Sequence, residues 1–174
     1  INYSELEIVV INDGSTDRTL EKLTDAYELR LMDRPYKRAI PTSDVRALYG
    51  SLAHPNLIVV DKEQGGKADA LNVGINLARY PLFCSIDADS IIEEDALLRV
   101  VKPFLEKPVV TIAAGGIVRI VNGCEVKHGR VTHIALSDRA LPILQVVEYL
   151  RAFLTGRVGW SNIQSLLIIS GAFG

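Results

Sequence analysis

Two aspartates, Asp87 and Asp89, stand one residue apart at the end of an apolar run over residues 82–86. Such a run predicts a buried strand, and ligand sites in α/β proteins open where strands end. Carboxylates at a strand end can share a divalent cation and the groups around a bound phosphate. The alternative is ordinary loop chemistry, in which Asp89 or Ser90 caps the helix that follows.

Another carboxylate, Asp13, follows the apolar run at residues 6–11 within the sequence Asn-Asp-Gly-Ser. A carboxylate there could accept a hydrogen bond from a nucleobase N–H or a ribose hydroxyl. Gly14 would let the backbone approach such a ligand closely. The alternative is a plain turn, because Asp, Gly and Ser are also ordinary turn residues.

A lysine, Lys67, follows two glycines at the start of a helix expected over residues 67–78. A lysine and free N–H groups at a helix start suit a diphosphate. The segment is not a P-loop, because Ala68 replaces the required Ser or Thr, and it lacks the dinucleotide fingerprint G-x-G-x-x-G. The alternative is a solvated lysine, although a cation at this position opposes the helix dipole.

The composition is that of one folded globular domain. The 174 residues are 48% hydrophobic and 23% charged, and the net charge of −2 argues against a nucleic-acid surface. Cys84 and Cys124 do not make a disulfide framework, so a reducing compartment is expected. The three His and the two Cys lack metal-ligand spacing. No run reaches the ~18 apolar residues of a membrane span, and no signal peptide opens the chain.

The order of elements predicts an α/β fold, because strands alternate with helices along the chain. We expect a mostly parallel sheet with helices on both faces. Strands are expected at residues 6–11, 57–60, 82–86, 109–114, 117–121 and 166–169, and helices at residues 16–31, 45–52, 67–78, 96–105 and 139–153. Ser15 or Asp17 can cap the first helix. Asp13, Lys67 and Asp87 then follow three successive strands, which fits one crevice.

The last expected helix, residues 139–153, is apolar nearly all round. Such a helix is typically buried. The alternative is a helix that lies on a bilayer surface or against membrane segments, with Arg151 and Arg157 facing the headgroups.

Six segments together resemble the family-2 nucleotide-sugar glycosyltransferases, from about Leu6 to Gly174. They read VVINDGSTD, NLIVVDKEQGGKADALNVGIN, FCSIDADS, GGIVRIVNG, QVVEYLRAF and LLIISGAFG. The resemblance is closest to the membrane-embedded synthases of cellulose, hyaluronan, chitin and poly-N-acetylglucosamine. It implies a GT-A fold, which is Rossmann-like, and an inverting sugar transfer from a UDP-sugar within a single partial domain over residues 1–174.

The resemblance also implies roles for single residues. By position, Asp13 would hold the uracil or uridine, Lys67 would lie near the nucleotide and its diphosphate, and Asp87 would face the ribose and diphosphate. Asp89 would ligate Mg²⁺ or Mn²⁺, and the metal would neutralise charge on the departing UDP. Part of the acceptor floor would be formed by Ser170, Gly171 and Ala172.

The chain departs from the family pattern at both ends. The first family strand, with its Pro-x-(Tyr/Phe)-Asn-Glu segment, is not found before Ile1. The acidic motif with the general base and the Gln/Arg-Trp motif are expected beyond Gly174. An inverting transfer needs a carboxylate to deprotonate the acceptor hydroxyl. We therefore expect a piece of a longer protein, with a sheet incomplete at both ends, that binds donor without turnover. If this piece did transfer sugar, Asp69 or Asp138 would be the first candidates for the base.

The interpretation favoured by the resemblance is the donor-binding half of a processive β-glycosyltransferase. It would face the cytoplasm at the cell membrane, attached by segments outside this chain, with a UDP-sugar and a saccharide acceptor as partners and no nucleic acid. One alternative is a soluble, non-processive transferase that adds one sugar. Another is a non-catalytic nucleotide-binding module.

Overall fold

The computed structural model describes residues 3–163 and 169–174. Where the sequence suggests one domain, the chain forms two compact units. The first unit is Ser4–Phe83 and the second is Cys84–Gly174, with Tyr3 also in the second. The two units are described separately below.

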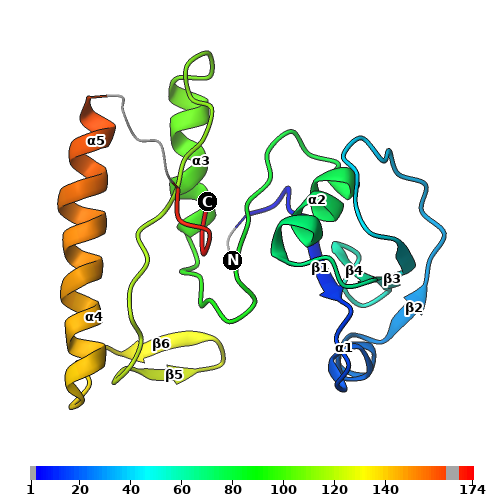
Figure 1. Ribbon diagram of the computed structural model, residues 1–174, viewed down its shortest axis with the longest axis horizontal. Coiled ribbons are helices and arrows are strands. Elements are labelled where there is room, and N and C mark those ends of the chain that lie inside the picture. Colours follow the sequence, from blue (N-terminus) through cyan, green and yellow to red (C-terminus); the bar gives the residue numbers. More distant parts are fainter. Residues whose placement is uncertain (1–2, 164–168) are drawn as a thin grey trace. The chain divides into compact units, whose positions relative to one another are not determined.

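The first unit is built on a four-stranded sheet with the order β1-β4-β3-β2 (Figure 1). The strands are β1 (Ile8–Asp13), β2 (Leu29–Leu31), β3 (Val45–Ser51) and β4 (Leu57–Lys62). β1 and β4 run parallel, whereas β3 is antiparallel to both β4 and β2. The expectation of a mostly parallel sheet is therefore wrong for these strands, because β2 and β3 are inserted between β1 and β4 in the sequence and add antiparallel pairs.

The prediction of a short helix at residues 45–52 is wrong, because this segment forms β3. Leu48 of β3 lies opposite Val60 of β4, and Leu48 is buried. A short apolar segment cannot be assigned to helix or strand by its spacing alone, and here pairing with a neighbouring strand decides. The same pairing forms β2, which the sequence suggested was the end of the first helix.

Helices cover both faces of this sheet, as the sequence predicts. α2 (Lys67–Leu77) packs Val73 and Leu77 against one face, where Ile58 and Val60 lie. α1 (Thr19–Tyr27) lies on the other side of the strands, where Leu20 and Leu23 pack against the core of Leu29, Leu57 and Val59 (Figure 1). β4 therefore contributes side chains to both cores, since successive residues of a strand point to opposite faces.

The start of α1 agrees in part with the expected cap. The Asp17 carboxylate accepts hydrogen bonds from the N–H of Thr19 at 3.0 Å and from its hydroxyl at 2.6 Å. Asp17 thus provides a hydrogen-bond acceptor for the first amide of the helix, although Arg18 is the residue directly before the helix. Glu28 ends the helix in the left-handed conformation, with φ of 49°.

Within its described residues, the second unit contains helices and a hairpin, apart from connecting segments (Figure 1). They are the helix α3 (Ala96–Glu106), a hairpin of β5 (Glu125–Lys127) and β6 (Arg130–His133), and a long helix of α4 (Ala140–Leu150), the π-helical η1 (Arg151–Arg157) and α5 (Val158–Asn162). Cys84 and Cys124 are free thiols. No described helix is long and apolar enough to cross a bilayer.

Three strands expected in this unit do not form among the described residues. Residues 82–86 pair only through one isolated bridge between Ile86 and Phe173, and residues 109–114 and 117–121 form no strand. Val109 and Ile112 are more than nine-tenths exposed. An apolar run becomes a strand only where a neighbouring strand accepts its hydrogen bonds along its length, and within residues 3–163 and 169–174 these runs find no more than a short bridge. The strand expected at residues 166–169 falls mostly outside the described residues.

The expected last helix forms and is longer than the pattern suggested, but α4 is not buried. None of its side chains is buried, and Leu141, Leu144 and Val147 are 76%, 66% and 59% exposed. Phe153 in η1 is buried and lies beneath the guanidinium of Arg157, 4.1 Å from the centre of the ring. The apolar pattern of α4 thus leaves an apolar surface on this unit.

Candidate functional site

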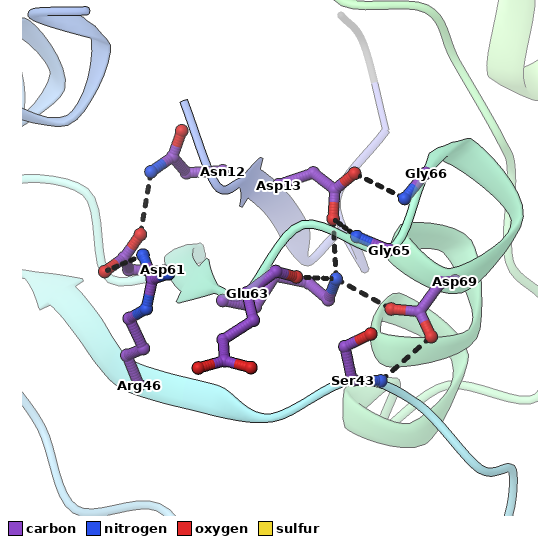
Figure 2. Close-up of polar contacts among 10 residues, drawn as sticks. Asn12, Asp13, Ser43, Arg46, Asp61, Glu63, Gly65, Gly66 and Asp69 are labelled. Carbon is purple, nitrogen blue, oxygen red and sulfur yellow. Dashed lines mark hydrogen bonds and ion pairs between the residues drawn. The ribbon is translucent and has the colours of Figure 1, made fainter. Parts of the chain in front are cut away.

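The Asp13 carboxylate joins the end of β1 to the turn that precedes α2 (Figure 2). Its Oδ1 accepts hydrogen bonds from Lys62 Nζ at 2.6 Å and from the N–H of Gly65 at 2.9 Å. Its Oδ2 accepts one from the N–H of Gly66 at 2.7 Å. The side chain of Asp13 keeps 24% of its surface exposed, so the carboxylate is still open to a ligand.

Lys62 is the last residue of β4 and is paired in register with Asp13. Its side chain has no exposed surface. Its ammonium forms ion pairs with Asp13 at 2.6 Å and with Asp69 at 2.7 Å, and it donates a hydrogen bond to the backbone oxygen of Glu63. One buried cation therefore links the ends of two strands to α2.

Asp69, in the first turn of α2, completes this network. Its Oδ1 accepts a hydrogen bond from the N–H of Ser43 at 2.9 Å. A Cβ on Gly65 would lie 2.5 Å from Asp69 Oδ2 and 2.8 Å from Ser43 Oγ. Only glycine allows the turn to approach α2 this closely.

The loops that follow β1 and β4 also touch directly. Gly14 has φ of 70°, and a Cβ there would lie 2.8 Å from the backbone nitrogen of Gln64. Beside this contact, the buried Asn12 donates from Nδ2 to Asp61 Oδ1 at 2.8 Å. The strand ends and the loops that follow them are therefore held together on both sides of Asp13.

Charges in the network stabilise one another. Burial by itself would lower the pKa of Lys62, but the hydrogen bonds and charges of Asp13 and Asp69 hold that pKa above its ordinary 10.5. Burial would likewise raise the pKa of Asp13, but Lys62 and the amides of the turn hold that pKa below 3.8. Hydrogen bonds from Lys62 and from the backbone of Ser43 lower the pKa of Asp69. All three groups are therefore ionised near neutral pH.

Lys67 is the first residue of α2 and is exposed. It directly follows Gly66, which has φ of 86° and whose N–H binds Asp13. The first unit thus brings two of the predicted site residues, Asp13 and Lys67, to one turn.

Asp87 and Asp89 lie in the second unit, in a tight turn. The N–H of Ser90 donates to the backbone oxygen of Asp87 at 3.0 Å, and Asp89 is exposed. α3 begins only at Ala96, with Asp95 before it, so neither Asp89 nor Ser90 caps that helix. The alternative of a helix cap is therefore wrong.

Asp87 lies beside the segment assigned to the acceptor floor. Its N–H donates to the backbone oxygen of Ala172 at 3.4 Å, and Ser85 exchanges hydrogen bonds with Gly174 at 2.7 and 3.3 Å. Within that segment, the N–H of Ala172 donates to Ser170 Oγ at 3.4 Å, across Gly171. The second unit thus brings Asp87 next to the chain of Ser170–Ala172.

Family membership follows from comparison with known proteins. Residues 1–151 match the family described as Glycosyl transferase family 2. The chain belongs to glycosyltransferase family 2. This confirms the family suggested by the sequence segments, and with it the GT-A fold and the class of enzyme.

Two relatives of this family-2 chain are poly-beta-1,6-N-acetyl-D-glucosamine synthases. The protein of Staphylococcus epidermidis is 30% identical over 111 residues, which are 62% of this chain and 20% of that protein. The protein of Staphylococcus aureus strain COL is 31% identical over 109 residues, with the same two shares. The chain therefore spans about a fifth of the relatives it matches. No solved structure matches it significantly.

Glycosyltransferases of family 2 commonly use a divalent metal. Among residues 3–163 and 169–174, no group of three or more His, Cys, Asp or Glu could hold one. Asp87 and Asp89 nevertheless suit such a metal. A divalent cation of this kind takes oxygen ligands and can complete its coordination shell with phosphate oxygens and water. They could supply two of those ligands from one turn.

The site residue that the sequence did not suggest is Lys62. A lysine at the end of an apolar strand resembles a solvated charge, which is its usual state. Its burial depends on the register of β1 with β4 and on the position of Asp69, which no short motif carries. The single crevice predicted from the strand ends would need residues of both units and stays a prediction.

Proposed function

We propose that this chain is the donor-binding part of an inverting glycosyltransferase that moves a sugar from a UDP-sugar to a growing polysaccharide. The observation that carries the proposal is the Asp13 carboxylate, held at the end of β1 against the turn that opens α2. Family membership supports the transfer reaction. The name of the two relatives supports a polysaccharide as the acceptor.

In this proposal Asp13 and Lys67 bind the donor. Three hydrogen bonds from described residues occupy Asp13, and an ionised carboxylate has about four acceptor positions. One position therefore remains for the N–H of a uracil or a hydroxyl of the ribose. Lys67, at the start of the same helix, would meet the diphosphate, where its positive charge and the helix N-terminus both favour an anion.

Asp87 and Asp89 would bind the part of the donor that leaves, which is UDP. Asp87 would face the ribose and diphosphate, and Asp89 would ligate Mg²⁺ or Mn²⁺. A bound metal supplies Lewis-acid stabilisation of the charge that develops on UDP. Ser170, Gly171 and Ala172 would form part of the acceptor floor, which the contact between Asp87 and Ala172 supports.

The location that we propose is the cytoplasmic face of the cell membrane. The exposed apolar side chains of α4 support a helix that lies on a bilayer surface or against membrane segments. A soluble, non-processive transferase and a non-catalytic nucleotide-binding module are the alternatives.

The test is UDP binding by calorimetry, with Mn²⁺ and again with EDTA. We expect the affinity to differ by more than ~10-fold, or ~1.4 kcal/mol, because the metal would bridge Asp89 and the diphosphate. Asp89→Asn should remove this difference, whereas the matched control Glu106→Gln should keep it, since Glu106 is an exposed carboxylate in the same unit as Asp89. Equal affinities with and without metal would remove the metal role, and an absence of UDP binding would overturn the proposal as a whole.

A further inference from the structure

The largest fully buried side chain in the described part of the molecule is that of a charged residue, Lys62. A buried ammonium costs free energy unless it is paired, and Lys62 is paired on two sides. Yet replacing a buried ion pair by apolar side chains is often neutral or stabilising. Stability alone is therefore a weak reason for a lysine at this position.

The contacts of Lys62 suggest a reason connected with binding. Its ammonium is closed off from solvent, so it cannot touch a ligand itself. It does hold Asp13 Oδ1, while the amide of Gly66 holds Oδ2. With both oxygens held, the acceptor position left on Asp13 points in one direction.

We propose that Lys62 is a positioning residue of the donor site, which fixes the Asp13 carboxylate so that one acceptor position stays open for the nucleoside. Through its second ion pair, with Asp69, Lys62 also fixes the first turn of α2, on which Lys67 stands. The inference rests on the proposed function, since it assumes that Asp13 meets the nucleoside.

Removing the charge of Lys62 has a defined electrostatic consequence. The ionised groups that face Lys62 are Asp13 from β1 and Asp69 from α2, while Glu63 contributes its backbone oxygen. Without the cation, the two carboxylates repel each other and the pKa of Asp13 rises. Protonated Asp13 no longer accepts from the nucleoside, so binding should weaken as the pH falls.

Two variants separate this charge effect from positioning. Lys62→Met removes the ammonium and keeps an unbranched apolar side chain of similar length. Lys62→Met/Asp69→Asn also removes one carboxylate, so the cluster regains its original net charge without its central donor. The second variant also avoids two unpaired carboxylates, and remains usable if the first does not fold.

The experiment measures uridine affinity by calorimetry at about pH 5 and about pH 7.5, together with the amide NMR signals of Gly65 and Gly66. In Lys62→Met we expect about tenfold weaker binding at neutral pH and a further loss at the lower pH. In the double variant we expect the pH dependence to disappear, while the affinity stays several-fold below that of the wild type and both amide signals remain shifted.

The outcomes distinguish this inference from the proposed function. A folded double variant that binds uridine as the wild type does, with unshifted amide signals of Gly65 and Gly66, would overturn the positioning role of Lys62 and leave the proposed function standing. A wild type that binds neither uridine nor UDP would overturn the proposed function, and the role of Lys62 in donor binding with it.

Discussion

Asp13 serves two purposes at once, because the three hydrogen bonds that orient its carboxylate also shape the turn before α2. This double role predicts how the two candidate carboxylates differ. Asp13→Ala should weaken binding of uridine and of UDP alike, by about tenfold, since in the proposed function Asp13 would bind the nucleoside. Asp89→Asn should weaken binding of UDP with Mn²⁺ and leave uridine binding nearly intact. Calorimetry with both ligands decides, with Glu106→Gln as the control. If Asp89→Asn harmed uridine binding as much as UDP binding, the assignment of Asp89 to the metal would be wrong.

The two neighbouring glycines of the turn should respond differently to a methyl group. A Cβ on Gly65 meets Asp69 and Ser43, whereas a Cβ on Gly66 meets open space and is opposed only by φ of 86°. We expect Gly65→Ala to lower the free energy of unfolding by about 2–3 kcal/mol, because Asp69 must leave Lys62 to make room. Gly66→Ala should cost about 1–3 kcal/mol through backbone strain alone, because φ of 86° with ψ of 171° is a conformation that essentially only glycine adopts. Urea unfolding measures both, and a loss well below about 1 kcal/mol in Gly65→Ala would contradict the close packing of Gly65.

Among single residues, the sequence suggests those that come directly after an apolar strand. Asp13 and Lys67 could be found because each follows an apolar run next to glycine. The network around Asp13 could not be found, because Lys62 reaches Asp13 only through strand register and Asp69 reaches Lys62 only through helix packing.

Among the elements, those with a single clear apolar pattern were predictable and those formed by pairing were not. β4 and α2 stand where the sequence indicated, with their apolar side chains in the core. The sequence predicts a helix at residues 45–52, where β3 forms, because this short segment has too few apolar positions to separate the two periods. Its identity comes from β2 and β4 on either side of it.

The apolar face of α4 leads to a prediction about association. Leu141, Leu144 and Val147 are exposed one turn apart, and an exposed apolar patch favours contact with another apolar surface. We expect the 174-residue chain to self-associate in solution. Leu144→Glu should reduce the apparent mass measured by light scattering, whereas Glu148→Gln on the same helix should not. A monodisperse monomer of the unmodified chain would contradict the prediction.

For the whole molecule, the fold class could be predicted but the division into two units could not. The alternation of strands and helices and the family segments both point to the α/β class, which family membership confirms. The second unit lacks the three strands expected in it among the described residues, since an apolar run alone does not provide a hydrogen-bonding partner. A crevice that joins Asp13 to Asp87 therefore stays a prediction.

The charge network of the first unit predicts how stability depends on pH. The pKa values of Asp13 and Asp69 are lowered in the folded chain, so their contribution is present above about pH 4 and is lost as the pH falls through the lowered values. The pKa of Lys62 is raised, so its contribution is present below about pH 10 and is lost as the pH rises through the raised value. From these groups we expect a urea midpoint that changes little from about pH 5 to about pH 9 and falls outside that window.

Lys62→Met should narrow the pH range over which the urea midpoint is constant, by raising the lower limit of that range. Removing the cation should cost about 2–3 kcal/mol at neutral pH, near the lower end of the range for breaking a buried pair, because Asp13 and Asp69 keep part of their surface exposed. Since the two carboxylates then repel each other and take up protons more readily, the urea midpoint should depend on pH between about pH 5 and about pH 7, where that of the wild type is flat. Lys22→Met is the matched control, because Lys22 is exposed on α1 and its loss should leave the profile unchanged. Circular dichroism across the urea transition gives both midpoints, and parallel pH profiles for Lys62→Met and Lys22→Met would mean that the buried ammonium does not hold the two carboxylates in their ionised form.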